Sequence, residues 1–307
     1  MSESQQAQSL KKERAMNKEI LDKLSSKGFV KSINLYESVT STNAIAKDFL
    51  YNDPISLPQL FVADEQTAGR GRMGRSWASP PGAGIWMSYL IKPDITPENI
   101  PQITLLAALS VTNAIITYGD KHALTTSPKI KWPNDIVLNG KKICGILTEL
   151  VSIPCNQEAE RSKLDTANYK NYVICGIGIN VNTASFPDEI SDKATSLLLE
   201  TKTTWNREEI ITETIKNLSD YICDFEKNQN LKFIQDEYNR RLISLGKEVR
   251  LINNQLENDK ITGTFEEGIY VSKGIDETGA LLVADTENNI RAISSGEISV
   301  RGLYTYT

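Results

Sequence analysis

Three glycines and three arginines are interleaved in the seven residues from Gly69 to Arg75. Glycine lets a backbone approach a ligand closely, and arginine supplies planar donors that match a phosphate or a carboxylate. Three cations so close in sequence repel one another unless an anion lies among them. We therefore interpret the segment as a clamp for an anionic ligand.

The same glycines satisfy G-x-G-x-x-G, and Asp94 lies 20 residues beyond the last of them, as in a dinucleotide fingerprint. Such a loop must open a helix that holds the pyrophosphate, but residues 79–82 read Ser-Pro-Pro-Gly and no helical periodicity follows. A protein kinase loop is excluded because the only histidine, His122, is followed by alanine rather than Arg-Asp. A loop that tracks a nucleic-acid backbone remains the non-enzymatic alternative.

Histidine and cysteine chemistry is not expected. His122 lies in a polar connection, which disfavours Ser-His-Asp and Cys-His mechanisms. The four cysteines, at positions 144, 155, 175 and 223, show no C-x-x-C spacing, so no zinc or other metal site is predicted. Cys144 and Cys175 lie in apolar runs, where a free thiol is typically a small core residue.

The composition is that of an ordinary globular protein, with 34 Lys and Arg against 39 Asp and Glu. The net charge of -5 argues against a general nucleic-acid binder. The longest apolar pattern, 103–116, is interrupted by polar residues and too short to span a bilayer, so no membrane partner is expected. No secretory signal is visible at the N-terminus, and the expected compartment is the cytoplasm.

Periodicity predicts the elements that would position the clamp. A short amphipathic helix is expected around 16–24, and cap-type side chains at 41–43 favour a second helix start. Asn139-Gly140 is the strongest hairpin signal, and 152–170 is expected to be a polar surface insertion. Strands are predicted over 33–36, 60–63, 84–91, 129–132, 136–138, 142–151 and 172–181, and helices over 103–118, 207–227 and 231–243.

After Leu245-Gly246 the pattern changes to short strands separated by Gly, Asn and Asp, at 248–252, 260–264, 270–272, 280–284 and 290–293. This spacing predicts a small all-β barrel. The predicted fold is therefore α+β, a mixed β-sheet backed by helices and followed by the barrel. The predicted divisions are a tail with a short helix over 1–30, a main domain over 31–245 and the barrel over 246–307.

Six blocks of this chain, in the same order, resemble the biotin protein ligases over about residues 33–302. The resemblance implies a class II synthetase-like domain that binds biotin and ATP, an SH3-like barrel, and an ATP-dependent ligase reaction through biotinyl-5′-AMP. The acceptor would be a lysine of a biotin carboxyl carrier protein domain. The blocks are Ser41-Thr42-Asn43, Gln66 with 69–75 and Trp77, Lys131-Trp132-Pro133-Asn134-Asp135, 141–147 with Glu149, 176–182, and 296–301.

The resemblance also implies site residues. Lys142 and Arg72 match the catalytic pair: the lysine contacts the reacting carboxyl and phosphate, and the arginine belongs to the loop that folds over the adenylate. Strand alternation would place Lys142 on one face with Cys144 and Ile146. The residues implied for biotin are Ser41, Thr42, Asn43, Gln66, Arg70, Gly71, Arg72, Lys142 and Gly145.

On the nucleotide side, Trp77 is expected near adenine and Arg301 is expected to close the site from the barrel. Mg²⁺ would arrive with the phosphates of ATP rather than in a protein cage. The residues implied for the nucleotide are Arg70, Arg75, Trp77, Lys131, Asp135, Asn180 and Arg301.

Two departures from the family bear on partners. The N-terminus lacks the DNA-binding domain of the repressor-type members, so a monofunctional ligase without a DNA partner is expected. The 152–170 insertion and the homodimer that forms by sheet pairing in the family are left open. A lipoate- or octanoate-type ligase is the alternative enzyme, but those relatives lack the Gly/Arg loop.

Overall fold

The computed structural model describes residues 16–52, 56–154, 169–257, 260–266, 268–294 and 298–302. The part before the C-terminal strands is built from α2 (Lys18–Ser26), β1 (Ser32–Val39), α3 (Thr42–Asn52), β2 (Gln59–Gln66), β3 (Gly84–Ile91), α4 (Gln102–Lys121), β4 (Lys129–Lys131), β5 (Asp135–Leu138), β6 (Lys141–Pro154), β7 (Tyr169–Asn180), α6 (Leu197–Thr201), α7 (Arg207–Asn228) and α8 (Lys232–Arg241).

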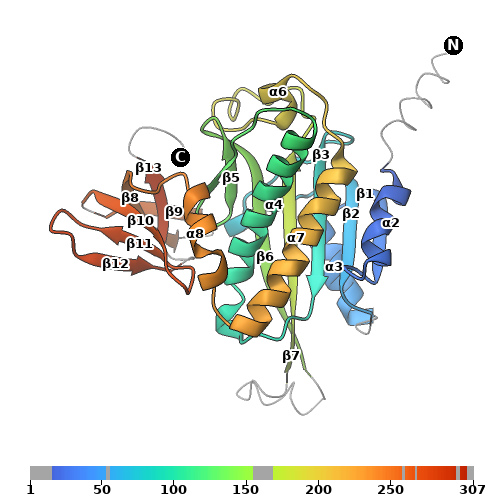
Figure 1. Cartoon of the computed structure of the whole chain (residues 1–307), viewed down its shortest axis with the longest axis horizontal. Coiled ribbons are helices and arrows are strands. Elements are labelled where there is room, and N and C mark those ends of the chain that lie inside the picture. Colours follow the sequence, from blue (N-terminus) through green and yellow to red (C-terminus); the bar gives the residue numbers. More distant parts are fainter. Residues whose placement is uncertain are drawn as a thin grey trace.

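The seven strands of this part form one sheet in the order β1-β2-β3-β7-β6-β5-β4. β1 and β2 are parallel and the other neighbours are antiparallel, which confirms the predicted mixed sheet. Helices α4 and α7 lie across one face, and α3 covers part of the other (Figure 1). One face of the sheet is therefore largely covered by helices, and the other leaves room beside α3 for a site.

The two faces have separate cores. The larger core joins α2, α4 and α7 to the sheet, and Leu21 and Leu24 of α2 are buried in it. The short helix predicted near the N-terminus is thus packed into the main body. The smaller core lies under α3 and includes Ala46, Leu50 and Phe61.

Helix α4 extends from Gln102 to Lys121, beyond the predicted apolar pattern. By length and composition alone the helix, with its preceding turn from Pro97, could cross a membrane, which corrects the expectation that the segment is too short. In the fold, 72% of its most apolar window is buried. Its apolar surface is thus the surface of a central core helix packed on α7 and the sheet.

The hairpin predicted at Asn139-Gly140 is confirmed, and both residues have the positive φ, 50° and 79°, that a type I′ turn requires. Beyond the turn a bulge interrupts the register, because Ile136 pairs with Cys144 but Val137 pairs with Lys142. The bulge adds one residue to β6 and changes which face each side chain occupies. The predicted alternation is therefore wrong. The Lys142 side chain lies on the same face of the sheet as Gly145, whereas Cys144 is buried in the larger core.

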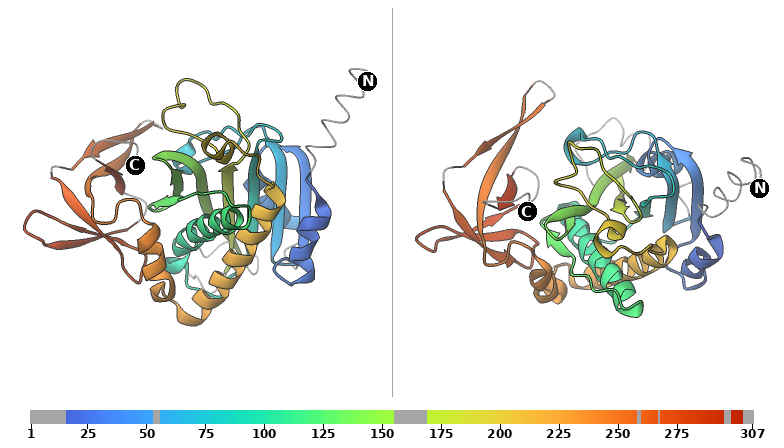
Figure 2. Two further views of the ribbon diagram at one scale, coloured as in Figure 1. Left: turned by 45° about the horizontal axis from the view of Figure 1, so that its top comes forward. Right: turned by 90° about the horizontal axis from the view of Figure 1, so that it is seen from above.

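The C-terminal part is a second, antiparallel sheet in the order β12-β11-β10-β8-β13, with β9 paired to β8. It lies beside α8, at the edge of the main sheet that carries β4 and β5 (Figure 2). This confirms a small all-β unit, with β13 as a strand that periodicity missed. The strands are β8 (Glu248–Glu257), β9 (Lys260–Phe265), β10 (Tyr270–Ile275), β11 (Leu281–Ala284), β12 (Ile290–Ile293) and β13 (Ile298–Gly302).

Candidate functional site

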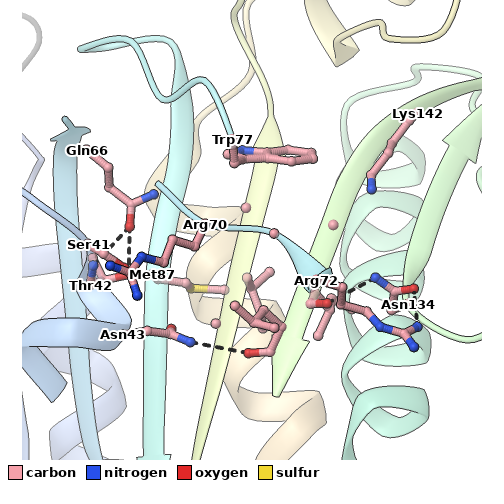
Figure 3. A pocket seen from close by; sticks show the side chains of 17 residues that line it. Ser41, Thr42, Asn43, Gln66, Arg70, Arg72, Trp77, Met87, Asn134 and Lys142 are labelled. Atoms are coloured by element: carbon pink, nitrogen blue, oxygen red, sulfur yellow. Dashed lines mark hydrogen bonds between the residues drawn. The ribbon is translucent and has the colours of Figure 1, made fainter. Parts of the chain in front are cut away.

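A pocket lies on the α3 face of the sheet, beyond the N-terminus of α3 and under the Gly/Arg loop (Figure 3). Its floor is made of glycines: Gly145 of β6 and Gly178 of β7 are register partners. A Cβ on Gly178 would lie 2.9 Å from the indole Nε1 of Trp77, and one on Gly145 would lie 3.0 Å from the same ring. The glycines thus let Trp77 lie directly over the sheet.

One end of the pocket, the hydrogen-bonding end, is lined by the polar side chains of Ser41, Thr42, Asn43 and Gln66, and Figure 3 shows Arg70 extending toward it. The backbone N–H and the hydroxyl of Thr42 donate to Gln66 Oε1 at 2.9 and 3.1 Å. Ser88 Oγ lies 2.7 Å from Thr42 Oγ1 and 2.5 Å from Asn43 Oδ1. Asn43 Nδ2 donates to Glu149 Oε2 at 2.5 Å, so the orientation of its amide is set from both sides. This end is held in place by its own hydrogen bonds.

The other end carries cations. Lys142 Nζ lies 2.6 Å from Asp135 Oδ1 and 5.0 Å from the centre of the Trp77 ring. Arg72 Nη1 donates to Asn134 Oδ1 at 3.0 Å. Burial lowers the pKa of Arg72, the charge of Asp135 opposes that shift, and the charge of Arg75 adds to it. Arginine nevertheless remains a cation in proteins, because its guanidinium deprotonates only under strongly basic conditions.

The Gly/Arg loop closes on itself by backbone hydrogen bonds, from Gly71 N to Arg75 O at 2.7 Å and from Trp77 N to Gly69 O at 2.9 Å. Gly69 is needed for close packing, since a Cβ there would lie 2.5 Å from the Trp77 carbonyl oxygen. The three arginines do not converge: two line the pocket, and Arg75 is exposed outside it. Figure 3 shows the side chain of Arg70 extending toward Thr42 and that of Arg72 lying beside Asn134, so the two lining arginines lie at opposite ends of the pocket and the predicted single clamp is not formed in this structure.

Ten of the predicted site residues line this one pocket. Figure 3 shows Gln66, Ser41, Thr42 and Asn43 on one side, Arg72 and Lys142 on the other, and Trp77 between them. The ten are Ser41, Thr42, Asn43, Gln66, Arg70, Gly71, Arg72, Trp77, Lys142 and Gly145.

Five predicted residues lie outside the lining. Asp135 holds Lys142 from the side, and Asn180 is buried at the end of β7, where its Nδ2 donates to Thr195 O at 3.2 Å. Lys131 belongs to β4. For Arg301 the structure places the backbone, in β13 opposite Arg250, and the block's Gly296-Glu297 lies outside the described residues. Arg75 is the fifth.

Other lining residues received no role from the sequence. Asn134, Gly176 and Gly178 stood inside matched blocks, and glycines two apart in a strand are a signal of close approach from outside the sheet. Asn43 makes that approach at Gly176. Met87 sits in an apolar strand with no signal. The remaining lining residues are Ile146, Leu147 and Ile177.

Comparisons with known proteins support this fold. The model of the Biotin/lipoate A/B protein ligase family matches residues 35–159, and that of the Biotin protein ligase C terminal domain matches residues 244–301. The first match indicates a ligase of the biotin and lipoate class, and the second indicates the biotin protein ligases within that class.

Two curated relatives resemble this chain over most of its length. The bifunctional ligase/repressor BirA of Bacillus spizizenii is 37% identical over 272 residues, which are 87% of this chain and 73% of the relative. The biotin--[acetyl-CoA-carboxylase] ligase of Mycobacterium tuberculosis is 27% identical over 240 residues, 78% of this chain and 77% of the relative.

Among solved structures, the biotin protein ligase from Aquifex aeolicus in complex with biotin and ATP aligns with a TM-score of 0.67 and 30% identity over 89% of this chain and 99% of that chain. The chain belongs to the biotin protein ligase family. The family and the ligase class predicted from the six blocks are thereby confirmed, as is the fold class with its SH3-like C-terminal unit.

Proposed function

We propose that this chain activates biotin with ATP and transfers it to a lysine of a biotin carboxyl carrier protein domain. The observation that carries the proposal is the contrast between the two ends of one pocket. Biotin has an uncharged ureido ring that needs donors and acceptors, and a carboxylate at the far end of an apolar chain. The pocket offers hydrogen-bonding groups with Arg70 at one end, Lys142 and Arg72 at the other, and glycines covered by an indole between them.

In the proposed binding mode, the ureido ring lies against Ser41, Thr42, Asn43 and Gln66. A buried polar ring is stable only where its groups find partners. The apolar chain runs between the two ends alongside Trp77, because the indole ring already covers Gly145 and Gly178. The carboxylate then reaches the end where Lys142 and Arg72 stand. Gly71 lies in the loop between the two ends, and Arg70 extends back toward the end that holds the ureido ring (Figure 3).

The first step joins two anions. A biotin carboxylate oxygen attacks the α-phosphorus of ATP, the bond to the β,γ-phosphates breaks, and pyrophosphate leaves. Lys142 and Arg72 offset the repulsion between the reactants and stabilise charge that develops on phosphoryl and carbonyl oxygens. Asp135 fixes Lys142 by their ion pair, so the ammonium is already positioned when the substrates arrive.

The nucleotide is proposed to lie beyond this cationic end. Trp77 would contact adenine, while Arg75, Lys131, Asp135, Asn180 and Arg301 are proposed for the nucleotide side. The described residues hold no group of three or more His, Cys, Asp or Glu that could bind a metal. Asp135 is engaged by Lys142, so Mg²⁺ fits as an ion carried by the phosphates rather than by the protein.

In the second step the carrier lysine amine attacks the carbonyl carbon of the adenylate, AMP leaves, and the amine loses a proton. Until then the mixed anhydride must be shielded from water. We propose that Arg72 and the Gly/Arg loop provide that cover.

The finer predictions about the whole protein also belong to this proposal. They are a ligase without a repressor role, a cytoplasmic location, a catalytic unit over 31–245 and a barrel over 246–307. A homodimer and the role of the 152–170 insertion are left open. The relative named a biotin--[acetyl-CoA-carboxylase] ligase supports a carboxylase carrier domain as acceptor. The lipoate- or octanoate-type and nucleic-acid-binding alternatives are disfavoured by the match to a biotin protein ligase C-terminal domain.

The test is to incubate the chain with biotin, MgATP and a purified biotin carboxyl carrier domain, and to weigh the carrier by mass spectrometry. We expect the mass of one biotinyl group on the wild-type carrier and none on a carrier whose target lysine is replaced by arginine. An unmodified wild-type carrier, with AMP and pyrophosphate also absent, would overturn the proposal.

A further inference from the structure

The turn between β10 and β11 is one of the places where the barrel contacts the main body. Asp276 closes this turn, because its carboxylate accepts from Thr278 N at 2.9 Å and Ala280 N at 3.0 Å. Gly279 has a φ of +81°, and a Cβ there would lie 3.0 Å from both Leu105 and Leu231. The turn is therefore rigid and fits closely between α4 and the start of α8.

Trp132 of the main body contacts this turn at Gly279. Its side chain is buried, and its indole Nε1–H donates to Gly279 O at 3.1 Å. A positive φ at Gly279 points this carbonyl in a direction that other residues rarely allow. The hydrogen bond thus joins the barrel to the segment 132–134.

The same segment ends at the cationic end of the pocket. Asn134, two residues after Trp132, accepts from Arg72 Nη1 at 3.0 Å and donates from its Nδ2 to Ile146 O at 3.1 Å. Its backbone carbonyl accepts from Ile146 N at 2.9 Å. Asn134 is therefore locked to β6 on one side and holds Arg72 on the other.

From these contacts we propose that Trp132 is a positioning residue that links the barrel to the Gly/Arg loop. The Gly279 carbonyl of the barrel fixes Trp132, and the segment 132–134 fixes Asn134. Asn134 in turn holds Arg72 over the pocket. The inference rests on the proposed role of Arg72 in retaining the adenylate. We call Arg72 and the contacts that hold it over the adenylate the latch. The inference makes the barrel a part of this latch, because the turn supplies one end of a continuous set of contacts.

The experiment measures how fast preformed radiolabelled adenylate leaves the full-length enzyme after an excess of unlabelled biotin is added. Trp132→Phe keeps an aromatic ring and removes the N–H together with the fused five-membered ring, so part of the buried indole volume is lost as well. Gln235→Met is the matched control, because Gln235 Nε2 donates to Ile275 O of the same region at 2.7 Å but has no link to Asn134. Asn134→Ala and Arg72→Gly serve as reference variants.

Loss of one hydrogen bond predicts about a two- to tenfold faster release from Trp132→Phe. We expect no change from Gln235→Met, and no further acceleration when Trp132→Phe is added to Asn134→Ala, because both act on one path. Thermal unfolding of each variant is recorded beside the release rate, so that a general loss of stability is visible.

Two results would overturn the inference in distinguishable ways. If Asn134→Ala and Arg72→Gly release adenylate faster but Trp132→Phe behaves as wild type or as Gln235→Met, the barrel is not part of the latch and the proposed function stands. If Arg72→Gly also releases adenylate at the wild-type rate, the proposed latch is wrong and the inference falls with it.

Discussion

The two ends of the pocket are built differently. At the hydrogen-bonding end, Thr42, Asn43, Gln66 and Ser88 hold one another by hydrogen bonds that the protein makes without a ligand. At the cationic end, Lys142 is held by the carboxylate of Asp135 and Arg72 by the amide oxygen of Asn134. A recognition site gains from being preformed, whereas a site that closes on an intermediate must keep groups that can change partners.

The largest effect is expected at the cationic end. Lys142→Ala should reduce ATP–pyrophosphate exchange on the order of a hundredfold or more, because one positioned charge is lost. Lys141→Ala is the matched control: that neighbour is turned away from the pocket, and its Nζ donates to Ser191 O at 2.9 Å. Equal exchange rates in both variants would contradict the assignment of Lys142.

Arg72→Gly should separate activation from retention. We expect adenylate synthesis to continue while release becomes roughly ten- to a hundredfold faster, the range for a lost hydrogen bond to a charged group that falls on the off-rate. The measurement is biotin labelling of an unrelated lysine-rich protein by blot, with ATP omitted as the control. Labelling at the wild-type level with synthesis intact would show that Arg72 does not retain the adenylate.

The floor between the ends gives a smaller effect. Gly178→Ala should raise the KM for biotin, since overpacking costs about 1 to 3 kcal/mol and the new Cβ would press on Trp77. Gly71→Ala is the comparison, because its nearest contact would be an ordinary 3.5 Å. A larger rise in KM from Gly71→Ala than from Gly178→Ala would show that the glycine floor does not limit biotin binding.

The smallest effect concerns the face assigned to Cys144. Burial raises the pKa of Cys144 above its usual range and that of Cys175 to about 12, so both thiols stay protonated at pH 8. Iodoacetamide should label exposed Cys223 in the folded protein and leave these two unmodified, as read by peptide mass spectrometry. Labelling of Cys144 that biotin suppresses would place it in the pocket and restore simple alternation.

Much of the sheet could be predicted because apolar periodicity and the Asn139-Gly140 turn are local signals. The bulge at Lys142 could not, since it depends on how β5 pairs with β6. The same limit applies to the site. Charged residues in a glycine-rich loop identified Arg70 and Arg72, but the exposure of Arg75 follows from the path of the closed loop. The role of Asn134 could not be predicted from the sequence, because its hydrogen bond with Arg72 depends on how the fold places the two residues.

Parallel ATP–pyrophosphate exchange with biotin, lipoate and octanoate tests most directly whether the hydrogen-bonding end of the pocket selects the substrate. All three acids present a carboxylate to Lys142 and Arg72, but only biotin has a ureido ring for Thr42, Asn43 and Gln66. We predict exchange with biotin and little or none with the other two. Comparable exchange with lipoate or octanoate would contradict the division of the pocket into a recognition end and an activation end.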